Sequence, residues 1–112
     1  MSFDYPLSKQ DEFISNLDRL RTYAPDLATA FRGVRVAADA HGPLDHKQRE
    51  LTLLAGFAAT RNEGGFRVHC TRASEAGATV AEIEHVVVLL LGTSLGLVPV
   101  VEALTWLHDE LD

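Results

Sequence analysis

Apolar side chains recur every three or four positions along most of this chain, which is the spacing of an amphipathic helix. The apolar run 86–91 is the one segment that could compete as a strand. There, Thr79 with Glu82 three residues later forms the signature of a capping box, which favours a helix. The pattern predicts an all-α protein, with about six helices in a single domain over residues 1–112.

Local signals set the expected boundaries of the first three helices. Met1–Pro6 is expected to be an irregular arm, and Ser8 to cap the first helix. Pro25 suits the first turn of the second helix, where its fixed backbone angle costs nothing. Asp45 is expected to cap a third helix that ends near residues 61–62.

The second half of the chain continues the helical pattern. Asn62–Gly65 is expected to form a turn or a loose helix start, followed by a fourth helix that stops at Gly77. A fifth helix over residues 80–91 is apolar nearly all round, so we expect it to be buried on all sides. A last helix extends to Leu111.

Composition narrows the class of protein. The chain has 112 residues, a formal net charge of −6 and one cysteine, so it offers no basic surface for nucleic acid and no intramolecular disulfide. Its longest apolar run is too short to span a bilayer, and no signal-like segment is visible. We therefore expect a cytoplasmic protein that binds neither nucleic acid nor membrane.

Glu50 and His69 are the candidate catalytic residues. Each lies among apolar neighbours on its own helix, and a carboxylate paired with an imidazole can divide acid and base work. The structural alternatives are a solvated Glu50 near a helix start and a hydrogen-bonded core histidine at position 69. The sequence leaves these alternatives open.

Two weaker candidates are a metal set that includes His46 and a thiol at Cys70. His46 and Glu50 share a helix face and, with His69, have the composition of a two-histidine, one-carboxylate metal set, but this spacing is common by chance and we predict no metal. Cys70 is expected to be a small buried apolar residue, with single-thiol chemistry as the lesser alternative.

Several motifs in order resemble the carboxymuconolactone decarboxylase family, which includes the alkylhydroperoxidase D-like proteins. Residues 44–51 resemble its LDxKxREL motif, and residues 69–79 its HxxxAxxAGAT segment. The resemblance covers roughly residues 24–111. It implies an alkylhydroperoxidase D-like helical bundle and places Glu50 and His69 at the positions of the family's glutamate and histidine.

The resemblance also shows what this chain lacks. Redox members carry Cys-x-x-Cys-x-x-x-His, whose cysteines would align with Asn62 and Gly65, so peroxidase activity is not expected. True decarboxylases commonly place an arginine two residues before the histidine, and Arg67 fits this position as a substrate-binding residue. The tail over residues 91–103, however, is closer to that of the small redox members.

The resemblance therefore implies a lyase-type enzyme that uses proton transfer on a small organic acid or lactone, as in the catabolism of aromatic compounds. It implies no cofactor, a small carboxylate or lactone as substrate, and a homotrimer or homohexamer. The apolar segment 80–91 independently favours self-association. The alternative is a non-catalytic, oligomeric binding or scaffold protein descended from redox ancestors.

The positions of Glu50 and His69 along their helices raise a geometric difficulty. Glu50 lies twelve residues before Asn62, whereas His69 lies only four after Gly65. In a tight hairpin this separates their depths by roughly 12 Å at ~1.5 Å rise per residue. A steep helix crossing, a fourth helix that includes the turn residues, or a second subunit would each bring the pair together.

Overall fold

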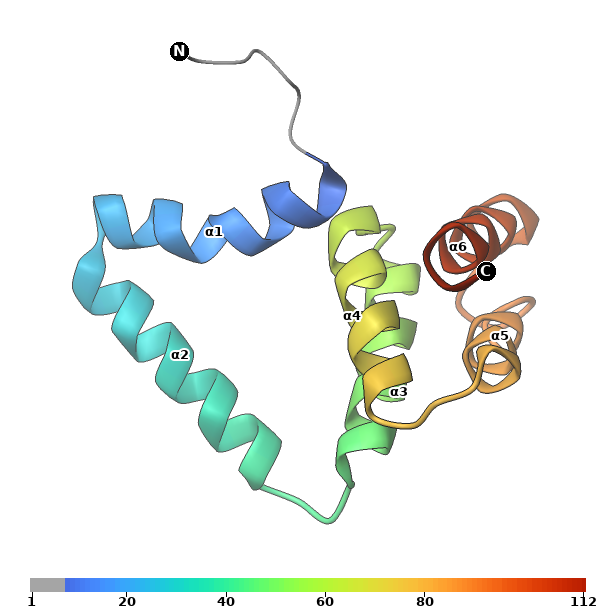
Figure 1. The fold of residues 1–112 in the computed structure, drawn as a ribbon, viewed down its shortest axis with the longest axis horizontal. Coiled ribbons are helices and arrows are strands. Elements are labelled where there is room, and N and C mark those ends of the chain that lie inside the picture. Colours follow the sequence, from blue (N-terminus) through green and yellow to red (C-terminus); the bar gives the residue numbers. More distant parts are fainter. Residues whose placement is uncertain (1–7) are drawn as a thin grey trace. The chain divides into compact units, whose positions relative to one another are not determined.

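A computed structural model describes residues 8–112, so the predicted arm Met1–Pro6 lies outside the described residues. The described part confirms the all-α prediction, because it contains six helices and no strand beyond one isolated bridge between Leu91 and Leu95 (Figure 1). None of these helices is long and apolar enough to cross a membrane. The helices are α1 (Lys9–Tyr23), α2 (Pro25–Ala40), α3 (His46–Ala59), α4 (Glu63–Glu75), α5 (Val80–Val88) and α6 (Leu97–Leu111).

The chain forms two compact units, and the first ends at Pro43. Within it, α1 and α2 pack against each other. The Ser8 side chain caps α1 by accepting from the Asp11 backbone amide, and Pro25 stands at the first turn of α2, both as predicted. Only Ala28 is buried among the described residues of these two helices, so their apolar residues do not form a core of their own.

The second unit, Leu44–Asp112, contains the core and every candidate site residue. Helix α3 packs along α4, and α4, α5 and α6 close around the apolar interior. The largest fully buried side chains come from all four helices: Leu54, Phe66, Cys70, Ile83, Val87 and Leu107.

Two capping boxes fix where α3 and α5 begin. The Asp45 carboxylate accepts from the Gln48 backbone amide, while the Gln48 side chain accepts from the backbone amide of Asp45. Thr79 and Glu82 form the same reciprocal pair, as predicted. Each box satisfies two backbone donors that a helix start would otherwise leave unpaired.

The boundary between α3 and α4 differs from the prediction. Helix α3 ends at Ala59 and not near residues 61–62, because Arg61 takes a left-handed backbone conformation with φ 54°. Asn62 is the cap of α4, and its side chain accepts from the backbone amide of Gly65. Of the two alternatives predicted for residues 62–65, the helix start is therefore the one observed.

The fifth helix also corrects the prediction. It ends at Val88, and residues 89–91 form turns closed by backbone bonds such as Leu90 to Val87. Only Ile83 and Val87 of α5 are buried, whereas Val88 and Leu89 are exposed. A short helix presents one face to its neighbours, so uniform apolarity did not produce burial on all sides within one chain.

Candidate functional site

Glu50 and His69 meet inside the second unit. Oε2 of Glu50 lies 2.5 Å from Nδ1 of His69, and each residue is only 7% exposed. When the carboxylate is ionised, Nδ1–H donates to it, which assigns the remaining ring nitrogen, Nε2, as the one that can exchange a proton. The pair is thus one buried unit with an acidic and a basic member.

The start of α4 explains how one chain brings these residues together. Glu50 precedes the last residue of α3 by nine positions, and His69 follows the first residue of α4 by six. The difference of three residues is about 4.5 Å of helix rise, which a glutamate and a histidine side chain can bridge. Of the three routes considered from the sequence, inclusion of the turn residues in α4 is the one observed.

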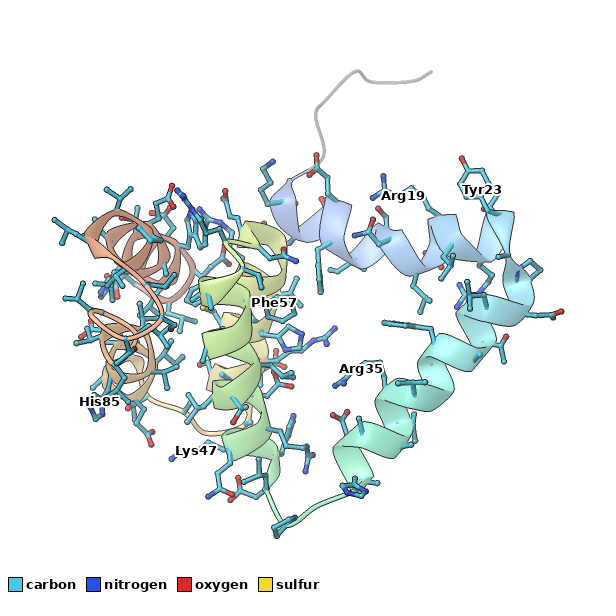
Figure 2. All side chains as sticks on the ribbon, turned by 180° about the vertical axis from the view of Figure 1, so that it is seen from behind. Arg19, Tyr23, Arg35, Lys47, Phe57 and His85 are labelled. Carbon is cyan, nitrogen blue, oxygen red and sulfur yellow. The ribbon has the colours of Figure 1, made fainter. Side chains whose placement is uncertain are left out.

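Phe57 completes the surroundings of His69. Its ring stacks on the imidazole with centroids 5.0 Å apart and an interplanar angle of 28°. Figure 2 shows Phe57 on α3. Gly65, one turn before His69 on α4, lies under the same ring, because a Cβ there would come within 2.5 Å of two Phe57 ring carbons.

Phe57 and Gly65 were not identified from the sequence as part of the site. Gly65 was interpreted as a turn residue, although its position four residues before His69 places both on one helix face. A side chain at position 65, cysteine included, would overlap the Phe57 ring. The local sequence carries no signal for this overlap, since it depends on how α3 and α4 pack.

His46 extends the site toward the start of α3. Its Nε2 lies 3.6 Å from Oε1 of Glu50, and its side chain is largely exposed. Glu50 thus lies close to both His46 and His69. Within residues 8–112, however, no three histidine, cysteine or acidic side chains are arranged to hold a metal ion.

Arg67 lies two residues before His69 but binds three carboxylates of its own chain. It donates to Glu63, one turn earlier in α4, and to Asp109 and Glu110 of α6 at 2.9–3.1 Å. Burial disfavours the guanidinium charge, but hydrogen bonds to these three carboxylates outweigh it and raise the pKa of Arg67. As a substrate ligand, Arg67 would have to release one of these partners.

Cys70 is buried in the apolar core as expected. Burial, and secondarily the charge of Glu110, raise the pKa of its thiol to about 12. A thiol of this kind is almost entirely protonated at neutral pH and reacts poorly as a nucleophile.

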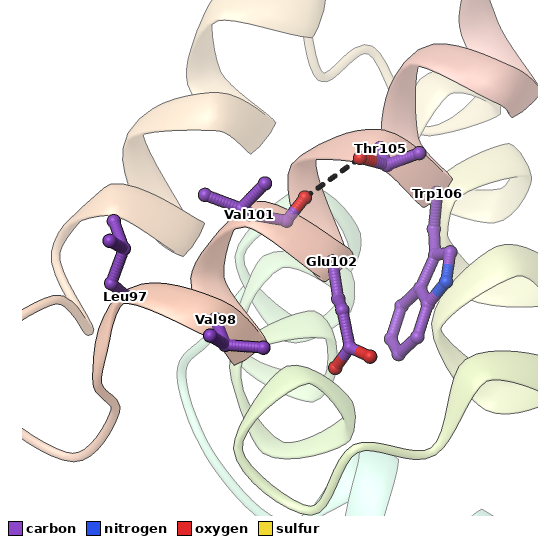
Figure 3. A pocket seen from close by; sticks show the side chains of 6 residues that line it. All are labelled: Leu97, Val98, Val101, Glu102, Thr105 and Trp106. Atoms are coloured by element: carbon purple, nitrogen blue, oxygen red, sulfur yellow. Dashed lines mark hydrogen bonds between the residues drawn. The ribbon is translucent and has the colours of Figure 1, made fainter.

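The outer face of α6 carries a shallow groove of about 400 Å³. Figure 3 shows its lining, which is mostly apolar and includes the Trp106 ring and the Glu102 carboxylate. Neither Glu50 nor His69 contributes to it. The groove is therefore separate from the Glu50–His69 pair.

Fold and site together define a small all-helical protein whose buried polar centre is a glutamate–histidine pair, with its only cysteine confined to the core. A comparison of the sequence with protein-family models identifies the same class of protein. Residues 25–109 match the model of the carboxymuconolactone decarboxylase family, so the chain belongs to this family. The resemblance deduced from the motifs is thereby confirmed.

A solved structure shows that the fold is shared. The chain is similar to the apo form of a carboxymuconolactone decarboxylase family protein from Legionella pneumophila, with a TM-score of 0.76 and 24% sequence identity. The alignment covers 93% of this chain and 95% of that one. No curated protein matches the sequence.

Proposed function

We propose that this protein is a proton-transfer enzyme that acts without thiol redox chemistry on a small carboxylic acid or lactone. The observation that carries the proposal is the buried 2.5 Å contact between Glu50 and His69. Burial strengthens the electrostatic coupling between the two groups, so each influences the proton held by the other. Membership of the carboxymuconolactone decarboxylase family supports this class of substrate.

Decarboxylation illustrates the chemistry that the pair can perform. A carboxylate β to a carbonyl leaves as CO₂, and the electrons of the broken carbon–carbon bond form an enolate. Protonated His69 then gives its Nε2 proton to the enolate carbon and becomes neutral. Glu50 holds the ring by Nδ1 and stabilises its charged form, and water restores the proton after the product leaves.

The test compares purified wild-type protein with Glu50→Gln and His69→Asn on a panel of carboxylated lactones and β-keto acids, measured by CO₂ release. We expect each substitution to lower turnover by about a hundredfold to ten-thousandfold, the usual range for general acid–base groups. The double variant should lose little more than either single one, since both act in one unit.

His85→Asn is the matched control, because His85 is an exposed histidine on α5. Its turnover should equal that of wild type, while circular dichroism should show that all variants keep their helices. Turnover that survives both Glu50→Gln and His69→Asn would contradict the proposal.

A non-catalytic binding or scaffold role is the second candidate. The observation that favours it is complete internal pairing: among the described residues, no buried side-chain nitrogen or oxygen lacks a hydrogen-bond partner. A pair so satisfied can serve to specify the core alone. Absence of turnover across the panel would favour this role; ligand-induced shifts in the His69 signals would then indicate binding, and their absence a scaffold.

We also propose that the protein is a cytoplasmic homo-oligomer, a trimer or hexamer. Exposed apolar residues on two helices of the second unit support self-association, notably Leu97, Val98 and Val101 at the α6 groove and Val88 at the end of α5. Sedimentation at micromolar concentration should give a species larger than 12.2 kDa, and a stable monomer would contradict this.

A further inference from the structure

Two contacts of His69 orient its ring: the hydrogen bond with Glu50 and the stack on Phe57. Glu50 fixes the direction of Nδ1 but leaves the imidazole able to turn about that contact. The Phe57 ring, stacked 5.0 Å from the imidazole, restricts this turning because stacked rings prefer a limited set of orientations. The two contacts together define where Nε2 points.

The position of the Phe57 ring depends on Gly65. A Cβ at position 65 would lie 2.5 Å from Cδ1 and Cε1 of Phe57 and 3.0 Å from Cγ, far inside van der Waals contact. These atoms include the root of the ring, so a small rotation of its tip would not relieve the overlap. The ring therefore occupies the volume that any other residue at 65 would need.

The backbone at Gly65 cannot easily move aside. Its amide donates to the Asn62 side chain at 3.0 Å, as part of the cap that starts α4, and Gly65 itself is buried. A substituted residue at 65 would have to displace either this cap or the Phe57 ring. The cap holds the Gly65 backbone in place, so the Phe57 ring is the part that we expect to move.

We propose that Phe57 is a positioning residue of the Glu50–His69 pair. The absence of a side chain at Gly65 is what allows the Phe57 ring to reach His69. That the histidine oriented by Phe57 is catalytic rests on the proposed function. The geometric relation among Phe57, Gly65 and His69 is testable without a substrate.

Gly56 provides a matched control for Gly65. It is also a helical glycine and is adjacent to Phe57 in α3, but a Cβ there would meet nothing within 4 Å. Gly56→Ala should therefore be neutral or stabilising, since alanine favours a helix over glycine. Gly65→Ala has the same chemical change and should displace the ring.

The experiment records ¹⁵N and ¹H NMR signals of the His69 ring in wild type, Gly56→Ala, Gly65→Ala, Phe57→Leu and the double variant Gly65→Ala/Phe57→Leu. In wild type and Gly56→Ala we expect the neutral ring to carry its proton on Nδ1, with an upfield ring-current shift from Phe57. In Gly65→Ala we expect loss of that shift and a mixture of the two neutral tautomers, because a ring that turns out of line weakens the Nδ1–H···Oε2 hydrogen bond that selects the Nδ1 tautomer.

Phe57→Leu separates positioning from folding. It should also lose the ring-current shift and mix the tautomers while remaining folded, because leucine still fills an apolar site. In this background Gly65→Ala should cause little further loss of stability by urea unfolding, since the ring that it would strike is gone.

Two results would overturn the proposal. One is a Gly65→Ala spectrum equal to that of Gly56→Ala. The other is a Phe57→Leu protein that keeps the wild-type tautomer, a measurement that stands even if Gly65→Ala fails to fold. Absence of enzymatic turnover would count against the proposed function alone, because the positioning of His69 is read from its own signals.

Discussion

Two polar contacts of α4 lie two residues apart and differ in kind. Arg67 pairs with Asp109 and Glu110 of α6 and with Glu63 of its own helix. Toward α3, His69 meets one carboxylate, that of Glu50, and an aromatic ring. One helix thus carries an arginine that is always charged and a histidine whose proton can move.

The Arg67 cluster is a structural contact, whereas the His69–Glu50 contact is one that acid–base chemistry can use. Arg67 keeps its proton at every accessible pH, so its cluster joins α4 to α6 without offering acid–base chemistry. His69 and Glu50 share one short buried contact, and an imidazole can both accept and release a proton. The comparison leads to predictions about Cys70, Arg67 and the pair itself.

The largest expected effect concerns Cys70, which lies beside His69 on α4 but faces the core. Raising the thiol pKa from 9.0 to about 12 lowers the thiolate fraction at pH 8 about a thousandfold, and burial slows access further. Modification by a disulfide reagent should be at least that much slower in the folded protein than in urea.

The same property predicts no dithiol-dependent reduction of alkyl hydroperoxides, in wild type or in Cys70→Ser. Rapid labelling of the folded protein, or a turnover removed by Cys70→Ser, would show that reactive chemistry on α4 is not confined to His69.

The next effect is the loss of the Arg67 cluster. Arg67→Met should lower the free energy of unfolding by about 2–3 kcal/mol. The Arg67 side chain is only 15% exposed, and its loss leaves three carboxylates without their cation. Urea unfolding at pH 7 measures this loss.

Lys47→Met is the control, since the Lys47–Glu82 pair is 37% exposed on both sides, so solvent screens it and its loss should cost clearly less stability than the loss of Arg67. Equal losses in the two variants would contradict a structural role for Arg67. Catalysis measured on Arg67→Met would further test its predicted contact with substrate.

Local chemistry made much of this structure predictable. The caps at Ser8, Asp45 and Thr79 form within four residues of chain, so their partners are visible in the sequence. The choice of Glu50 and His69 as partners also depended on the resemblance of the motifs around them to the carboxymuconolactone decarboxylase family, to which the chain belongs.

The features that sequence reasoning missed depend on packing or on competing local signals. The sequence leaves residues 62–65 open as a turn or a loose helix start, and the Asn62 cap, which was not predicted, decides for the helix start and brings the pair together. Apolarity at residues 89–91 is compatible with helix and turn alike, which is why α5 was predicted too long. The Phe57 ring over Gly65 exists only once α3 and α4 are packed.

The central claim is that Glu50 and His69 act as one unit, and a double-mutant cycle in urea unfolding at pH 7 tests it most directly. The variants are Glu50→Ala, His69→Ala and both together; loss of the Phe57 stack occurs with His69→Ala in either background and cancels. A charge-assisted contact predicts a coupling energy of about 1.5 kcal/mol or more. Additive losses, with a coupling below about 0.5 kcal/mol, would contradict the account.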